Sequence, residues 1–130
     1  MRTLTYEFAA STRPSHRAHV GVVGSGDLEV LLEPDGETGT PGHARVRVRT
    51  SVEGFDEVWQ ATLERFFARV PVLGSWELND SAATPALVTL RLQQAAAAAG
   101  AVDAAQEDAT GVPEYPTGAR KDTNGGEKAP

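Results

Sequence analysis

A serine between two glycines is the part of this chain best suited to chemistry. The Gly-Ser-Gly-Asp run at residues 24–27 joins residues 17–23 to residues 28–33. Both flanking segments are apolar and rich in β-branched residues, which predicts two strands with a tight glycine-rich turn between them. Because neither neighbour of Ser25 has a side chain, we expect its hydroxyl to be open to solvent. Such an arrangement suits a group that another molecule must reach.

A catalytic role for Ser25 finds little support in the sequence. A serine nucleophile needs a general base close by. The candidate bases are His16, His19 and His43. The Gly-x-Ser-x-Gly elbow of serine hydrolases is absent, since Val23 and Asp27 stand where its glycines would be. A phosphate-binding loop is also disfavoured, because the run is short and no lysine follows it.

Two interpretations of the turn remain. Either a separate enzyme attaches a group to Ser25, or the turn has no chemical role. In the first case Gly24 and Gly26 would allow that enzyme to approach closely and would permit turn dihedrals that side chains resist. Asp27 and Glu29 would then engage the enzyme or orient the attached group, whereas in the second case they are ordinary polar strand residues. The histidines do not have the spacing of metal ligands, so we assign no metal.

The elements that position this turn follow from apolar periodicity. Alternation predicts strands over residues 3–9, 17–23, 28–33, 43–52 and 76–79, and helical spacing predicts helices over 55–70 and 81–100. Thr84 is the predicted N-cap of the second helix, with Pro85 at its first helical position. The β-β-β-β-α-β-α order predicts an α+β domain, with a mostly antiparallel sheet and two helices on one face.

The spacing also predicts which side of each element faces the core. In the first helix this side carries Phe55, Val58, Trp59, Leu63, Phe66 and Val70. In the second it carries Leu87 and Leu90, with Val88 and Leu92 flanking them, and the alanines at 95–99. The strand at 43–52 places Arg45, Arg47 and Arg49 on its other face. This stripe would either contact phosphates or an acidic partner, or form a solvated face.

Composition limits the class of protein. The chain has 130 residues, a net charge of −6 and no cysteine. It has no signal peptide and no apolar run of about 18 residues, so we expect a cytoplasmic protein without a membrane segment. It is too poor in basic residues for nucleic-acid binding. We expect one domain over residues 1–100 and a disordered tail over 101–130, where apolar periodicity stops.

The segment around Ser25 resembles a known family. Residues 18–34 read AHVGVVGSGDLEVLLEP, which is similar to the prosthetic-group site of the malonate decarboxylase acyl carrier protein, the δ subunit. Agreement continues at residues 48–52, 65–67, 79–85 and 88–94 and at Trp59. The resemblance covers roughly residues 3–98 and leaves the tail outside it. The carrier chain of citrate lyase, the γ chain, is similar in outline with a more distant motif.

The resemblance implies a role and a mechanism. Ser25 would carry phosphoribosyl-dephospho-coenzyme A through a phosphodiester, with Gly24, Gly26 and Asp27 as the supporting loop. The thiol of this arm would hold an acetyl group, which a transferase subunit exchanges for malonyl and a decarboxylase subunit regenerates with loss of carbon dioxide. The chain itself would catalyse nothing, and its fold would differ from the four-helix bundle of ordinary acyl carriers. The alternatives are a citrate lyase-type carrier and a small binding module without an acyl group.

Overall fold

The computed structural model describes residues 1–34 and 41–101. Its elements are strands β1 (Arg2–Ala9), β2 (Ala18–Val20), β3 (Leu28–Glu33), β4 (His43–Thr50) and β5 (Gly74–Asp80), and helices α1 (Asp56–Arg69) and α2 (Pro85–Ala98). The predicted order of elements is confirmed. Of the tail predicted over 101–130, residues 102–130 lie outside the described residues, while Ala101 is part of the end of α2, where its amide bonds the Ala96 carbonyl. Neither helix in the described part of the chain has the length and apolarity that a membrane crossing needs.

All five strands form one sheet in the order β1-β4-β5-β3-β2. The pairings β1–β4, β3–β5 and β2–β3 are antiparallel, and only β4 and β5 are parallel. Helix α1 connects these two parallel strands, as a βαβ unit requires. The mostly antiparallel α+β architecture predicted from the sequence is therefore confirmed, and the fold is not a helical bundle.

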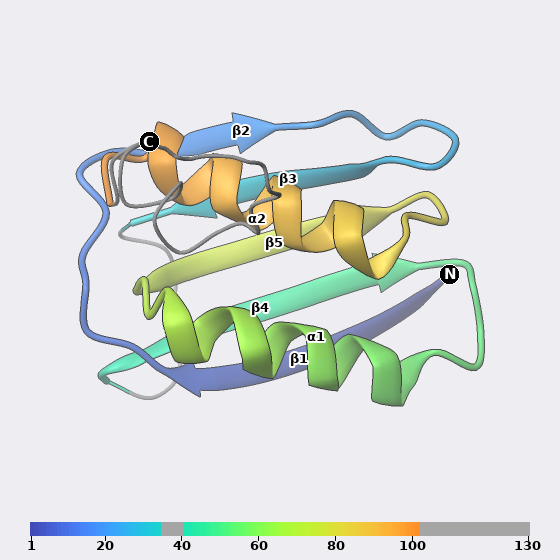
Figure 1. The fold of residues 1–130 in the computed structure, drawn as a ribbon, viewed down its shortest axis with the longest axis horizontal. Coiled ribbons are helices and arrows are strands. Elements are labelled where there is room, and N and C mark those ends of the chain that lie inside the picture. Colours follow the sequence, from blue (N-terminus) through green and yellow to red (C-terminus); the bar gives the residue numbers. More distant parts are fainter. Residues whose placement is uncertain (35–40, 102–130) are drawn as a thin grey trace, which may run out of the picture.

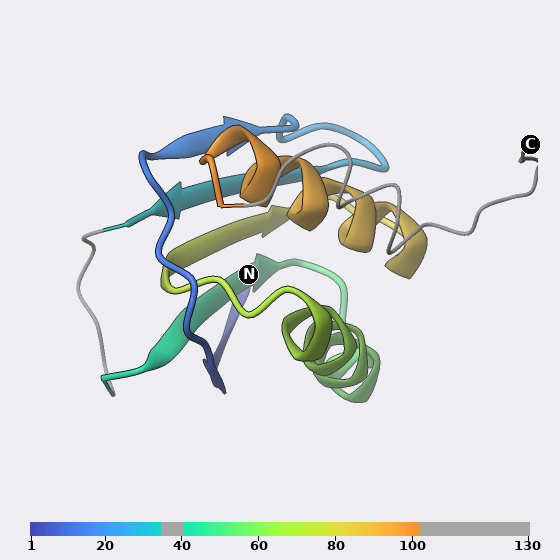
Figure 2. The same cartoon turned by 60° about the vertical axis from the view of Figure 1, so that its left-hand side comes forward.

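Both helices cover the same face of the sheet (Figure 1). Helix α1 lies over the β1 side and α2 over the β3 and β2 side, and the turned view shows the other face uncovered (Figure 2). The core between the layers is formed by alternate residues of the central strands, such as Val30, Val46 and Leu78, all fully buried. Strand alternation thus places one apolar face against the helices and one polar face in water.

The helix faces differ in part from those predicted. Trp59, Leu63 and Phe66 are buried as expected, but Phe55 and Val58 at the start of α1 are exposed. In α2 the buried side carries Val88, Leu92, Ala95, Ala96 and Ala99, and the predicted core residue Leu90 is 47% exposed. The prediction was therefore wrong at Leu90, whereas the alanine part of the predicted face and its flanking residues Val88 and Leu92 are buried as expected. The apolar residues nearly surround the start of α2, so its sequence does not by itself fix which side the sheet covers.

The ends of α2 follow the predicted chemistry. Thr84 is the N-cap and accepts a hydrogen bond from the Leu87 amide at 3.2 Å, with Pro85 at the first position. At the other end the Gly100 amide donates to the Ala97 carbonyl and the Ala101 amide to the Ala96 carbonyl. This pair of bonds is the Schellman arrangement, which satisfies carbonyls that the helix leaves unpaired.

Candidate functional site

Ser25 lies exposed in the loop that connects β2 to β3. The loop extends beyond the sheet at the end where β4 and β5 also finish (Figure 1). The chain leaves β2 at Val20, so the strand predicted to continue to residue 23 is shorter than expected. As a result the connection is a seven-residue loop over 21–27, longer than the tight Gly-Ser-Gly-Asp connection predicted over 24–27.

Gly21 explains why the strand stops. Its φ is +75°, a conformation that costs residues with a side chain roughly 1–2 kcal/mol. A Cβ at this position would lie only 1.9 Å from the carbonyl oxygen of Leu28, the first residue of β3. Only glycine allows the two backbones to approach in this way. Gly24 and Gly26 were predicted to matter and Gly21 was not, although a glycine among valines is a recognised sign of close backbone approach.

The tip itself is a four-residue turn. The Asp27 amide donates to the Gly24 carbonyl at 2.9 Å, which places Ser25 at a central position of the turn. Gly26 has a φ of +78°, and no atom lies within 4 Å of where its Cβ would be. The space around the tip is therefore open, and Gly26 is required by backbone conformation and not by crowding.

Asp27 anchors the loop to helix α2. Arg91 Nε donates to Asp27 Oδ1 at 2.8 Å, and Arg91 Nη2 donates to Oδ2 at 3.1 Å. The amides of Leu28 and Val22 donate to the same carboxylate. The pKa of Asp27 is lowered from its ordinary value, mainly by the Arg91 hydrogen bonds and then by that of the Leu28 amide. The side chain is thus held ionised and fully engaged, so it supports the loop and does not project from it.

A second attachment joins the tip to the loop between β5 and α2. The Gly26 amide donates to the Ser81 carbonyl at 2.6 Å, and the Ser81 amide donates to the Asp27 carbonyl at 3.0 Å. Neither this pairing nor Arg91 was found from the sequence. Arg91 gave a weak signal, as a cation among leucines and valines in α2. The bonds between Ser81 and the tip gave no sequence signal, because they join backbone amides to backbone carbonyls and do not depend on the side chains.

Two apolar side chains share the tip with Ser25. Val22 is 61% exposed and Val23 is 66% exposed. A surface serine between bare glycines, with two valines nearby, offers an accessible hydroxyl and an apolar contact to another protein. Exposed apolar groups that gather at one place on a small domain often mark an interaction site.

Ser25 has no general base in the described part of the chain. No side-chain hydrogen bond to its hydroxyl is found within residues 1–34 and 41–101. His19 pairs with Glu29 at 2.8 Å, His16 with the Ala98 carbonyl, and His43 with the Pro41 carbonyl. Within the described residues, histidine, aspartate and glutamate side chains form no group placed to hold a metal ion. The geometry offers an accessible hydroxyl that nothing here activates.

The other candidate residues lie on the uncovered face of the sheet. Glu29 accepts from Asn79 at 2.9 Å as well as contacting His19, so it belongs to a polar network across three strands. Arg47 pairs with Glu77 on the neighbouring strand. The arginine stripe, on β4, points to this face together with Glu29 and is separate from the Ser25 turn. Its predicted contact with an attached phosphate is not tested by this arrangement.

The turn can accommodate a phosphodiester on Ser25. The nearest carboxylate along the chain is Asp27, whose charge is balanced by Arg91. The positions on either side of Ser25 carry no side chain, and the space around Gly26 is open. A bulky anionic group there would meet neither a steric barrier nor an unpaired negative charge from Asp27.

Comparison with known proteins assigns this fold and loop to a class. Residues 15–99 match the family described as the malonate decarboxylase delta subunit (MdcD), an acyl carrier protein (ACP) family. The malonate decarboxylase acyl carrier proteins of Pseudomonas fluorescens SBW25 and Pseudomonas savastanoi pv. phaseolicola are each 50% identical over 95 residues, covering 72% of this chain and 92% of theirs. The class is that of acyl carrier proteins, which implies a covalently attached prosthetic group.

A solved structure agrees. The chain is similar to one in the crystal structure of a Pseudomonas malonate decarboxylase hetero-tetramer in complex with malonate, with 47% identity and a TM-score of 0.65. The match covers 73% of this chain and 95% of that one. The chain belongs to the malonate decarboxylase delta subunit family.

Proposed function

We propose that this chain is the acyl carrier subunit of a malonate decarboxylase and that Ser25 carries its prosthetic group. The observation that supports this most is an exposed, unactivated serine on an anchored loop, in a chain that belongs to this family. We further propose that residues 1–100 form the carrier domain and that the complex works in the cytoplasm, in keeping with a chain that has no cysteine.

The attached group is phosphoribosyl-dephospho-coenzyme A. In the attachment reaction a bond forms between Ser25 Oγ and phosphorus, the hydroxyl proton leaves, and the bond from phosphorus to the leaving group of an activated donor breaks. A separate transferase supplies the base and the donor, because the described residues hold no base beside Ser25. The carrier's own contribution is an accessible hydroxyl, with Gly24, Gly26 and Asp27 shaping the turn around it.

The anchoring of the loop supports a carrier role. Asp27 is bound by Arg91, and Gly26 is bound by Ser81, so the base of the loop is fixed while its tip is open. When bound, the group supplies a thiol on which an acyl group is held as a thioester. Tethering then keeps the acyl group at high effective concentration for both a transferase subunit and a decarboxylase subunit. Val22 and Val23 provide an apolar contact at the tip for the enzyme that attaches the group.

Reconstitution of the complex tests this function. The carrier is coexpressed with the prosthetic-group transferase and the other subunits, and malonate-dependent release of carbon dioxide is measured. Ser25→Ala is expected to abolish release, while Ser51→Ala, which removes another exposed serine directly after β4, leaves it unchanged. Full activity of Ser25→Ala would favour a binding module without an acyl group. Activity on citrate and not on malonate would favour the citrate lyase-type carrier.

A further inference from the structure

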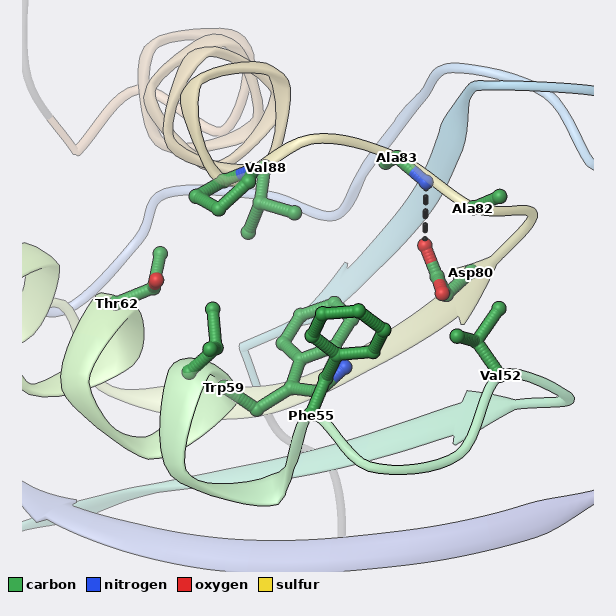
Figure 3. A pocket seen from close by; sticks show the side chains of 10 residues that line it. Val52, Phe55, Trp59, Thr62, Asp80, Ala82, Ala83 and Val88 are labelled. Atoms are coloured by element: carbon green, nitrogen blue, oxygen red, sulfur yellow. Dashed lines mark hydrogen bonds between the residues drawn. The ribbon is translucent and has the colours of Figure 1, made fainter.

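A pocket opens between the first turns of α1 and α2, at the end of the sheet that also carries the Ser25 loop. Its volume is about 320 Å³, at the lower end of the range for small-ligand sites, about 300–1,000 Å³. Its walls include Val52, Phe55, Val58, Trp59, Thr62 and Val88. Figure 3 shows Thr62 on α1 and Val88 on α2 facing one another across it. Trp59 and Val88 also belong to the hydrophobic core, so the pocket opens directly onto the core at this end of the sheet.

The mouth of the pocket exposes large apolar side chains. Phe55 is 49% exposed and Val58 is 41% exposed, and both line the pocket. Together with Val22 and Val23 at the Ser25 tip, they are among the most exposed large apolar residues of the described chain. An apolar pocket with exposed apolar groups around it gains free energy when an apolar ligand covers it.

One polar group inside the pocket has no partner. The Thr62 side chain is 4% exposed, and its Oγ1 has no hydrogen-bond partner among the residues that the structure describes. A buried hydroxyl without a partner is unfavourable and uncommon in native proteins. In this rotamer Oγ1 is shielded from solvent, so contact with a ligand in the pocket requires the other of the two χ1 rotamers that threonine populates in a helix. The hydroxyl would then donate a hydrogen bond to a carbonyl oxygen that entered the pocket.

The rim of the pocket is joined to the Ser25 loop. Asp80, Ala82 and Ala83 line the pocket, and Ser81 between them is the residue that pairs with Gly26 and Asp27. Asp80 Oδ1 accepts from the Ala83 amide, as drawn in Figure 3, and so holds this rim in place. Ala82 has a φ of 65°, a strained conformation for a residue other than glycine. A strained, hydrogen-bonded rim therefore lies next to the residue bonded to the Ser25 turn.

We propose that this pocket binds the acylated end of the arm attached to Ser25. The inference rests on the proposed function, because it needs that arm. The ligand is a short acyl thioester, whose apolar part contacts Val52, Val58 and Val88 and whose carbonyl oxygen accepts a hydrogen bond from Thr62. No bond is made or broken in the pocket. Exclusion of water there protects the thioester from hydrolysis while the carrier is between its partner subunits.

The tethered arm is a better candidate than a segment of a partner protein. Its attachment residue is next to Gly26, which is bonded to the rim of the pocket, so binding is intramolecular. The pocket is small and carries a single unpartnered hydroxyl, which matches one carbonyl group and not a peptide with many. A partner segment is the competing outcome of the test below.

Methyl NMR spectra of apo and acetylated carrier test the occupant. Intact mass first establishes that the arm is attached, and its absence would refute the proposed function and not merely the pocket. With the arm attached, the methyl signals of Val52, Val58 and Val88 are expected to shift, while Val72, in the core and outside the pocket, stays constant. Fully modified carrier with unchanged pocket signals would overturn the pocket proposal alone. Pocket signals that move only when a partner subunit is added would assign the pocket to that protein.

Hydrolysis of the thioester gives a second, independent test. Ala83→Trp fills the pocket, and Ala86→Trp is its matched control, an exposed residue of α2 outside the pocket. If the acyl end occupies the pocket about four-fifths of the time, only about one-fifth of it is open to water at any moment. Ala83→Trp is therefore expected to speed hydrolysis roughly fivefold. Thr62→Val, which keeps the side-chain shape, is expected to speed it less. Equal rates in wild type, Ala83→Trp and Thr62→Val would overturn the proposal.

Discussion

Arg91 and Asp27 are joined by two hydrogen bonds, of 2.8 and 3.1 Å, that connect the middle of helix α2 to the loop carrying Ser25. These residues are 64 positions apart in the sequence. The contact fixes the base of the loop against a rigid helix, while the glycines leave its tip accessible. A carrier needs both properties, because its attachment residue must be reached by several partners yet be presented in one orientation to each.

The pH dependence of this contact follows from the direction of the Asp27 pKa. Because folding lowers this pKa, the ionised Asp27 carboxylate stabilises the folded state. This contribution is complete at pH values above the ordinary pKa of the group, about 3.9. That contribution is lost as the pH falls through the lower, folded value. We expect the Val22 and Gly26 amide signals to be constant from neutral pH down to about pH 5, and to move only in more acidic solution. An amide NMR titration measures this.

Arg91→Met tests whether Arg91 is what lowers the pKa of Asp27. Since the Arg91 hydrogen bonds are the largest influence on Asp27, their removal is expected to raise its pKa towards the ordinary value and to increase amide exchange in the loop. Arg65→Met, at an exposed position on α1, is the matched control and should leave both unchanged. An Asp27 titration that is identical in wild type and Arg91→Met would contradict this description of the anchor.

Gly21→Ala is expected to destabilise the protein far more than Gly24→Ala. The positive φ alone costs roughly 1–2 kcal/mol, and the contact of the new Cβ with the Leu28 carbonyl adds to it, so we expect a loss of about 2 kcal/mol or more. Gly24 has no positive φ, and its Cβ would meet only a Val22 methyl at 3.5 Å. Its substitution should change the free energy of unfolding by less than about 0.5 kcal/mol. Chemical denaturation compares the two, and equal losses would show that Gly21 is not what ends β2.

Thr62→Val is expected to stabilise the apo protein. It removes a buried hydroxyl that has no partner among the described residues, which should raise the free energy of unfolding by about 1 kcal/mol. Thr50→Val is the contrasting variant, since Thr50 is also buried but donates to Asp80 at 2.9 Å and accepts from the Val52 amide. Loss of the Thr50 hydroxyl should lower the free energy of unfolding by roughly 1–3 kcal/mol. Denaturant titrations of both variants measure this, and a destabilising Thr62→Val would show that its hydroxyl is satisfied.

Replacement of both Val22 and Val23 by serine is expected to slow attachment of the prosthetic group. Loss of two apolar contacts with the transferase should lower kcat/KM roughly tenfold, the equivalent of about 1.4 kcal/mol. The fold should be unaffected because both side chains are exposed. Leu90→Ser, at an exposed position on α2, serves as the control. Unchanged attachment kinetics in the double variant would show that the transferase recognises another surface.

The sequence predicted the local features of this fold better than its long-range contacts. Strand 28–33 and the Thr84 and Pro85 helix start were predicted correctly, because alternation and capping act between neighbours in the sequence. The side of α2 that faces the sheet was predicted wrongly at Leu90, because the apolar residues there surround most of the helix. The exposed serine was identified directly from its flanking glycines.

The support beneath the serine could not be predicted in the same way. The Arg91 and Asp27 contact depends on how α2 crosses the sheet, and the Gly26 and Ser81 contact uses only backbone atoms. The pocket beside it is formed by two helix starts that are brought together only by the tertiary fold. The apolar periodicity of a single helix or strand carries no information about such contacts between elements.

Peptide mass spectrometry of carrier from a functioning complex tests the central claim most directly. Cleavage after Arg17 and Arg45 releases residues 18–45, in which Ser25 is the only serine and Thr38 and Thr40 are the only threonines. We predict that this peptide carries one phosphoribosyl-dephospho-coenzyme A and that fragmentation places it on Ser25. An active complex in which this peptide is unmodified, or in which the group is on another residue, would contradict the account.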